Sequence, residues 1–102
     1  MAQILVLYNP PADAAAFDKY YFETHAPIAR KIPGLRGMSF STAPPMAIMG
    51  SAPHLVVRLN FDSMADLQAA LVSPEGQATA ADLANFAHSG ATVLAFDTRA
   101  DQ

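Results

Sequence analysis

Cysteine and tryptophan are both absent from this chain of 102 residues, and only 15% of its residues are charged. Without cysteine there is no disulfide, no thiolate nucleophile and no sulfur-ligated metal site. The 6 lysine and arginine residues are scattered along the sequence, so we expect no basic surface for a phosphate backbone. These absences exclude disulfide-stabilised, thiol-dependent and nucleic-acid-binding proteins.

Long hydrophobic runs are absent as well. The longest apolar stretches have the length of a strand, well below the ~20 residues of a membrane-spanning helix. The first residues lack a positively charged region and lead directly into an apolar run, so we expect no signal peptide. The sequence therefore predicts a cytoplasmic protein with no membrane partner.

Apolar residues make up 52% of the sequence, a large share for a chain with so little charge. A single domain of this size, spanning residues 1–102, buries somewhat under ~70% of the surface that its unfolded chain exposes. Part of the apolar surface must then be covered by something other than the chain itself. The composition predicts one globular domain that associates with a partner subunit.

The hydrophobic pattern predicts strands and helices that alternate along the chain. The run from Gln3 to Asn9 is apolar on both faces and is typical of a central strand. A helix follows Asp13, and Pro27 is expected to end or kink it near His25. The remaining expected elements are strands over residues 36–41 and 54–62, helices that start at Ser63 and Ser73, and a last strand over residues 91–96.

This order is β-α-β-β-α(α)-β, the split βαβ pattern of a ferredoxin-like α+β fold. It predicts a four-stranded antiparallel sheet with helices on one face. The other face, which includes Val56 and one side of the first strand, is too apolar to stay in water. Two sheets packed face to face would cover it, so we expect a homodimer.

The chain carries motifs in a characteristic order. The first helix and the turn after it contain Phe17-x-x-Tyr20-Tyr21-x-x-x-His25-x-Pro27 and then Pro33-Gly34-Leu35. The second half contains Phe61-Asp62-Ser63, Leu67-Gln68-Ala69-Ala70-Leu71, Ser73-Pro74-Glu75-Gly76, Asp82-Leu83 and Phe86. In order and spacing, over nearly the whole chain, these motifs resemble the EthD family, named for a gene cluster that degrades ethyl tert-butyl ether.

The resemblance implies a dimeric α+β barrel, in which the sheets of two ferredoxin-like protomers close into one barrel. It also implies a small-molecule pocket between sheet and helices in each protomer, and no cofactor. Proteins of the same architecture include muconolactone isomerases, polyketide cyclases and small cofactor-independent monooxygenases. The stretch Thr42–Pro53, rich in methionine and proline, departs from the family pattern, and so long a connection is expected to be functional or mobile.

His25 and Tyr21 are the candidate catalytic residues. They lie one helical turn apart, so their side chains are neighbours, and a histidine exchanges protons near neutral pH. The alternative is a structural role for His25, capping the carbonyls that Pro27 leaves without donors. A tyrosine hydroxyl would orient a substrate oxygen, but tyrosines on a helical stripe are also common core residues.

Four further residues are candidates for substrate binding. Tyr8 ends the first strand, and Phe17 and Tyr20 belong to the apolar stripe of the first helix. His54 is expected on the same strand face as Arg58 and Asn60, where it faces either a ligand or the dimer interface. The histidines at positions 25, 54 and 88 lack the spacing of metal ligands, so we expect no metal site.

The sequence leaves three functions open. The first is a cofactor-independent proton-transfer enzyme (an isomerase, cyclase or decarboxylase) in the catabolism of a small apolar or aromatic compound. The second is a non-catalytic accessory or binding protein of an oxygenase degradation system. The third is a cofactor-independent monooxygenase.

Overall fold

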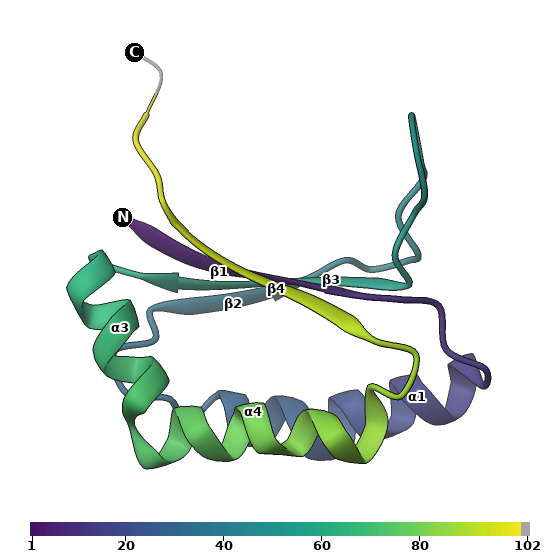
Figure 1. Ribbon diagram of the computed structural model, residues 1–102, viewed down its shortest axis with the longest axis horizontal. Coiled ribbons are helices and arrows are strands. Elements are labelled where there is room, and N and C mark those ends of the chain that lie inside the picture. Colours follow the sequence, from purple (N-terminus) through teal and green to yellow (C-terminus); the bar gives the residue numbers. More distant parts are fainter. Residues whose placement is uncertain (101–102) are drawn as a thin grey trace.

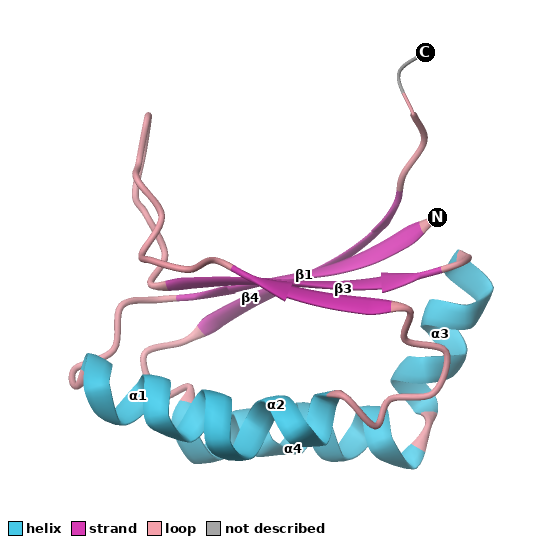
Figure 2. Ribbon diagram, turned by 180° about the vertical axis from the view of Figure 1, so that it is seen from behind, coloured by secondary structure: helices cyan, strands magenta, loops and turns pink. Residues whose placement is uncertain are grey.

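The computed structural model describes residues 1–100, which form one antiparallel sheet covered on one face by helices (Figures 1 and 2). None of the helices in this part of the chain is long and apolar enough to span a membrane. The strands are β1 (Ala2–Tyr8), β2 (Gly37–Phe40), β3 (Leu55–Phe61) and β4 (Ala91–Asp97), and the helical elements are α1 (Ala14–Tyr20), η1 (Tyr21–His25), α2 (Ala26–Ala29), α3 (Met64–Val72) and α4 (Pro74–Phe86).

The predicted ferredoxin-like α+β fold is confirmed. The strands lie in the order β2-β3-β1-β4, and β1 occupies a central position as its two apolar faces indicate. The register aligns Val6 of β1 with Val57 of β3 and with Val93 of β4.

Alternate residues of β1 and β3 point to the helices and form the core. Buried side chains and half-buried or exposed side chains take turns along both strands, because successive residues of a strand face opposite sides of a sheet. The core residues of these two strands are Ala2, Ile4, Val6, Tyr8, Leu55, Val57, Leu59 and Phe61. The helix-facing side of the sheet is thus the side that can hold an enclosed site.

Pro27 was expected to end or kink the first helix near His25, and the helix does not end there. It continues to Ala29, and the irregularity takes the form of a π-helical turn, η1, in which the Ala26 N–H donates to the carbonyl of Tyr21. A proline lacks an N–H, and the wider turn accommodates it without breaking the helix. In this turn Thr24 is exposed to solvent and His25 is buried.

A tight corner joins α3 to α4. The Ser73 hydroxyl donates to the carbonyl of Ala70 at 2.6 Å and accepts from the N–H of Gly76 at 3.0 Å. Gly76 is buried against this corner, and a Cβ added to it would lie 2.0 Å from the Ala70 carbonyl oxygen. The close approach of the two helices therefore requires glycine at this position.

Residues 41–54, which connect β2 to β3, extend from the open face of the sheet, away from the helices, and so does the C-terminal tail (Figures 1 and 2). Met46, Ile48 and Met49 in this connection are 85%, 92% and 93% exposed. The open face thus has a projecting segment at each end.

Replacement of Gly76 by alanine should destabilise the fold by about 1–3 kcal/mol, because the added methyl group collides with the α3 backbone. Helix propensity alone predicts the opposite, a gain of ~1 kcal/mol for alanine. Gly37→Ala is the control, since a Cβ there lies 3.6 Å from its nearest neighbour, an ordinary contact. Urea denaturation measures both variants, and a Gly76→Ala protein as stable as the wild type would refute the steric account.

Candidate functional site

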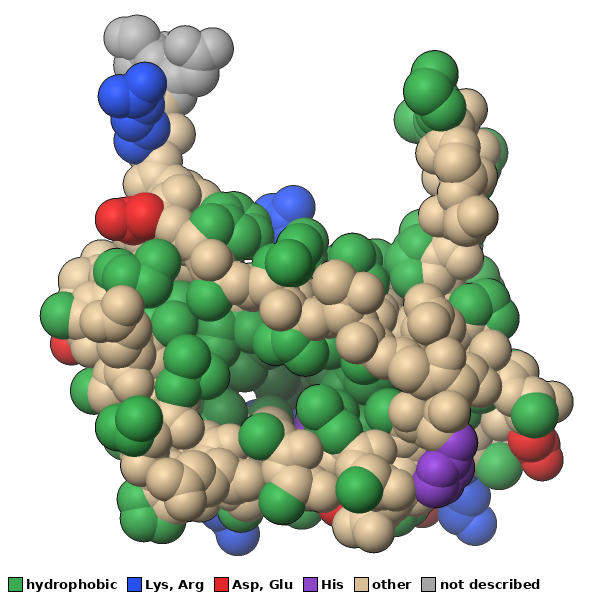
Figure 3. Space-filling model, in the orientation of Figure 1, with side chains coloured by type: hydrophobic (Ala, Val, Ile, Leu, Met, Phe, Trp, Pro, Cys, Tyr) green, Lys and Arg blue, Asp and Glu red, His purple; other side chains and the backbone are tan. Residues whose placement is uncertain are grey.

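A cavity of about 260 Å³ lies between the sheet and the helices. All four strands contribute to its floor, and small side chains at Ala29, Ala70, Gly76 and Ala80 leave the space open. In the space-filling view the molecule is hollowed between β4 and α4, and the sides of the hollow are mostly apolar (Figure 3). Its other lining residues are Ile4, Val6, Tyr8, Tyr21, His25, Ile32, Met38, Val57, Leu59, Leu71, Thr79, Leu83 and Val93.

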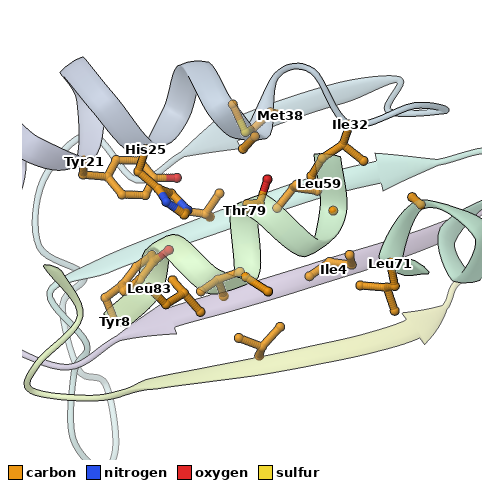
Figure 4. A pocket seen from close by; sticks show the side chains of 17 residues that line it. Ile4, Tyr8, Tyr21, His25, Ile32, Met38, Leu59, Leu71, Thr79 and Leu83 are labelled. Atoms are coloured by element: carbon orange, nitrogen blue, oxygen red, sulfur yellow. The ribbon is translucent and has the colours of Figure 1, made fainter. Parts of the chain in front are cut away.

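The polar groups of the cavity gather at one end. Tyr8, Tyr21 and His25 lie together there, while Ile4, Met38 and other apolar side chains occupy the opposite end (Figure 4). The ring centroid of Tyr21 is 5.5 Å from that of Tyr8 and 5.4 Å from that of His25. Among the described residues that line the cavity, these three carry the titratable groups.

His25 is held in place by Asp82 of α4. Its Nδ1 lies 2.8 Å from the Asp82 Oδ2, and both side chains are buried. The imidazole ring also packs against Phe86, with ring centroids 4.7 Å apart. The hydrogen bond ties η1 to α4 and fixes the plane of the imidazole at the polar end of the cavity.

Asp82 is an ionised carboxylate with three donors. The Tyr20 hydroxyl donates to its Oδ1 at 2.7 Å, the Asn85 Nδ2 donates to the same oxygen at 2.9 Å, and His25 holds the other oxygen. Burial raises the pKa of Asp82, but the hydrogen bonds from Asn85, Tyr20 and His25 outweigh it and hold the pKa below its ordinary value. The negative charge is therefore present at neutral pH.

His25 is neutral at pH 7, because burial lowers its pKa more than the Asp82 carboxylate raises it. A carboxylate only accepts hydrogen bonds, so the single proton of the ring is on Nδ1 and is donated to Asp82. Nε2 then carries a free lone pair, and no described residue donates a hydrogen bond to it. This arrangement presents a base to the cavity.

Tyr8 and Tyr21 present hydroxyl donors. Burial raises the pKa of both phenols, so both stay protonated at neutral pH. Neither hydroxyl has a hydrogen-bond partner among the described residues, where every fully buried side-chain nitrogen or oxygen does have one. Both hydroxyls therefore reach the open space of the cavity.

The structure places three of the candidate binding residues outside this cavity. Phe17 packs in the core against Tyr8, with ring centroids 5.3 Å apart. Tyr20 points to Asp82, because neighbouring helical residues face different directions. His54 lies at a separate hollow beneath the connection of residues 41–54.

The prediction that His54 lies on the same strand face as Arg58 and Asn60 is wrong. Strand β3 begins at Leu55, so the alternation that places Arg58 and Asn60 on the open face does not extend to His54. Its side chain turns to α1 instead, where Nε2 lies 2.7 Å from the Asp18 Oδ1 and the ring contacts Phe17. This second histidine–aspartate pair joins the end of the connection of residues 41–54 to α1.

Asp82 and Asn85 belong to the candidate site, but the sequence pattern gave Asp82 only as part of a family motif and did not indicate Asn85. Asp82 is the one charged residue of α4 beyond its first turn, and it stands beside the apolar positions Leu83 and Phe86. An isolated carboxylate on an apolar helical stripe is a signal for a buried partner.

No group of three or more histidine, aspartate or glutamate side chains in residues 1–100 is arranged to hold a metal ion.

The His25–Asp82 pair should make stability depend on pH. Because the pKa of His25 is lower in the folded chain than its ordinary 6.5, the unfolded chain binds a proton first as the pH falls. The free energy of unfolding should therefore decrease from pH 7 to pH 5, and less steeply in His25→Gln. Urea titrations at both pH values test this, with the exposed His88→Gln as control. Equal slopes in the wild type and His25→Gln would contradict it.

A family model of the EthD domain matches residues 9–90. A protein of Rhodococcus erythropolis, described as an uncharacterized 11.0 kDa protein in the thcB-thcC intergenic region, is 39% identical over 99 residues, which cover 95% of this chain and 94% of that protein. These matches confirm the resemblance that the motifs indicate.

Comparison with solved structures gives similar proteins along nearly the whole chain. An EthD family protein from Bacillus halodurans has a TM-score of 0.87 at 35% identity and covers 97% of this chain and 99% of its own. A dimeric ferredoxin-like protein of unknown function from Thermobifida fusca has a TM-score of 0.69 at 13% identity, with coverages of 95% and 90%. SnoaB, a cofactor-independent oxygenase from Streptomyces nogalater, has a TM-score of 0.64 at 14% identity, with coverages of 97% and 93%.

The last two structures are too distant in sequence to carry more than the fold. The family model and two relatives of more than 30% identity, in contrast, agree along nearly the whole length. On this agreement the chain belongs to the EthD domain family.

Proposed function

We propose that the cavity binds a small, largely apolar molecule and that His25 transfers a proton to or from it without a cofactor. The reaction type is that of an isomerase or a cyclase. One observation carries the proposal: Nδ1 of His25 is held by the Asp82 carboxylate, so that Nε2 is a free base at the cavity. The apolar walls supply binding energy but take no part in the chemistry.

The lowered pKa of His25 suits this role. An imidazole that is neutral at pH 7 is ready to accept a proton, and once it has done so the nearby carboxylate stabilises the imidazolium. The attraction is stronger than in water, because both side chains are buried. The proton is then returned from Nε2 to another atom of the same molecule.

The test follows carbon-bound hydrogens by NMR in D₂O over a panel of small ketones, lactones and phenols. A proton-transfer enzyme exchanges or isomerises one of them, and His25→Gln should lose about 10²–10⁴ of the rate. The rate of the wild type should fall as the pH drops through the lowered pKa of His25, because the protonated ring is no base. An unchanged rate in His25→Gln would eliminate the proposed role.

A cofactor-independent oxygenase is the second candidate, since SnoaB shares the fold. The same base would remove a proton from an electron-rich substrate, and the carbanion would react with O₂. Oxygen uptake with substrate alone, measured with an oxygen electrode, favours this candidate. Saturable binding without exchange, product or oxygen uptake over the whole panel favours an accessory binding protein.

We further propose that the protein is a homodimer in which two open sheet faces pack together. The open face carries Leu5, Leu7, Val56, Leu94 and Phe96, and the register pairs Leu5 with Leu94 and Leu7 with Val56. Leu94 is 46% exposed and Phe96 is 38% exposed. The dimeric state of the ferredoxin-like protein from Thermobifida fusca supports the proposal, because packed sheets remove such apolar surface from water.

Light scattering should give about twice 10.8 kDa. Leu94→Glu should produce a monomer, since it places a charge in the apolar centre of the proposed interface. Val72→Glu is the control, because Val72 is 71% exposed on α3, on the helical side of the molecule. A wild-type monomer at micromolar concentration, or a Leu94→Glu dimer as stable as the control, would defeat the proposal.

A further inference from the structure

Two donors and one acceptor face the same end of the cavity. The Tyr8 and Tyr21 hydroxyls have no partner among the described residues, and Nε2 of His25 offers a lone pair beside them. The one other hydroxyl of the lining, that of Thr79, already donates to the carbonyl of Glu75 at 2.8 Å. A ligand that bonds to all three of these groups must accept hydrogen bonds from the hydroxyls at one atom and offer a hydrogen to Nε2 at a neighbouring atom.

The rest of the lining restricts the charge of the ligand. No lysine, arginine, aspartate or glutamate is among the described residues that line the cavity, and α3, α4 and β4 contribute the apolar side chains of Leu71, Leu83 and Val93. An ion taken from water into such surroundings loses several kcal/mol of solvation, and two neutral hydroxyls without a countercharge replace only part of it. The cavity therefore selects neutral molecules.

The volume restricts the size. A cavity of about 260 Å³ is smaller than the ~300–1,000 Å³ of sites for drug-sized ligands. A ligand with one ring and short substituents fits this space, with its apolar part toward Ile4 and Met38 and its polar atom toward the tyrosines.

A carbonyl oxygen fits the two donors. It has two lone pairs, one for each hydroxyl, and it gains negative charge when a proton leaves the adjacent carbon. Hydrogen bonds to an oxygen that becomes charged are stronger than those to a neutral one, so the two hydroxyls favour the charged form over the bound ketone. The phenols remain donors throughout, because burial raises the pKa of each.

We propose that the substrate is a neutral, enolisable carbonyl compound of one-ring size, a ketone or a lactone, whose oxygen lies between the hydroxyls of Tyr8 and Tyr21. The inference rests on the proposed role of His25, whose Nε2 faces the carbon next to the carbonyl. Tyr8 and Tyr21 are thus assigned as the residues that bind the substrate oxygen.

Removal of the α-hydrogen involves only the substrate and His25. The Nε2 lone pair forms an N–H bond with the α-hydrogen, and the electron pair of the broken C–H bond becomes a C=C bond. The π pair of the carbonyl moves to its oxygen, where the two hydroxyls hold the enolate. Return of the same proton to the same carbon regenerates the substrate. When the proton on Nε2 is first replaced by deuterium from D₂O, its return to that carbon gives exchange, and its return to a different carbon of a conjugated substrate gives an isomer. No oxidant or reductant takes part.

The experiment uses cyclohexanone, cyclohex-2-enone and δ-valerolactone as probes, with methylenecyclohexane as the isostere without oxygen and cyclohexanecarboxylate as the anion. Calorimetry measures binding, and NMR in D₂O measures exchange of the α-hydrogens. We expect at least one carbonyl probe to bind about 3- to 10-fold more tightly than the hydrocarbon, and the carboxylate to bind more weakly than both.

Tyr8→Phe and Tyr21→Phe keep the rings and remove the hydroxyls. Each should reduce the preference for the carbonyl probe and lower the exchange rate by about 10²–10³, the usual cost of one lost oxyanion donor. Thr24→Val is the control, since it removes an exposed hydroxyl from the same helical turn. Circular dichroism verifies that each variant is folded.

The outcomes separate the two proposals. In one outcome, His25→Gln abolishes exchange while both tyrosine variants retain the wild-type rate. This result overturns the assignment of the carbonyl site to the tyrosines and supports the role of His25 as the base. Carbonyl binding that depends on the tyrosines, with no exchange in the wild type, supports the oxygen site and rejects proton transfer. Preferred binding of the carboxylate, or no binding of any carbonyl probe at millimolar concentration, overturns the inference.

Discussion

The hydrogen bond between His25 and Asp82 is the interaction on which the site depends. It joins the π-helical turn to the middle of α4, and it is buried, so an unpaired Asp82 carboxylate would be costly. Tyr20 and Asn85 complete the coordination of that carboxylate from the side away from the cavity. These hydrogen bonds stabilise the buried negative charge of Asp82, and they orient His25 so that its Nε2 faces the cavity.

The cavity follows from the same arrangement. The helical layer is fixed at its polar end by this hydrogen bond and at its other end by the corner between α3 and α4, where Gly76 permits close approach. Between these two points, small side chains such as Ala29 and Ala80 do not fill the space above the sheet. A rigid frame with too little side-chain volume inside it leaves an apolar cavity that is open between β4 and α4 and polar at one end.

Periodicity predicted the parts of this structure that depend on local sequence. The four strands, the central position of β1 and the proximity of Tyr21 to His25 follow from alternation and from one-turn spacing. The partner of His25 did not follow, because Asp82 is 57 residues away and the contact exists only after α4 has packed against η1. His54 was misplaced for a related reason: it lies just before β3, where the alternation of the strand no longer sets the direction of a side chain.

The central claim is that His25 is a neutral base with its proton on Nδ1. Long-range ¹H–¹⁵N correlation spectra of the labelled protein report which ring nitrogen is protonated, and a pH titration of the same signals gives the pKa. The account predicts a protonated Nδ1 and an unprotonated Nε2 at pH 7, with a pKa below 6.5 that rises toward 6.5 on unfolding. A proton on Nε2 at pH 7, or a pKa above 6.5 in the folded protein, would contradict it.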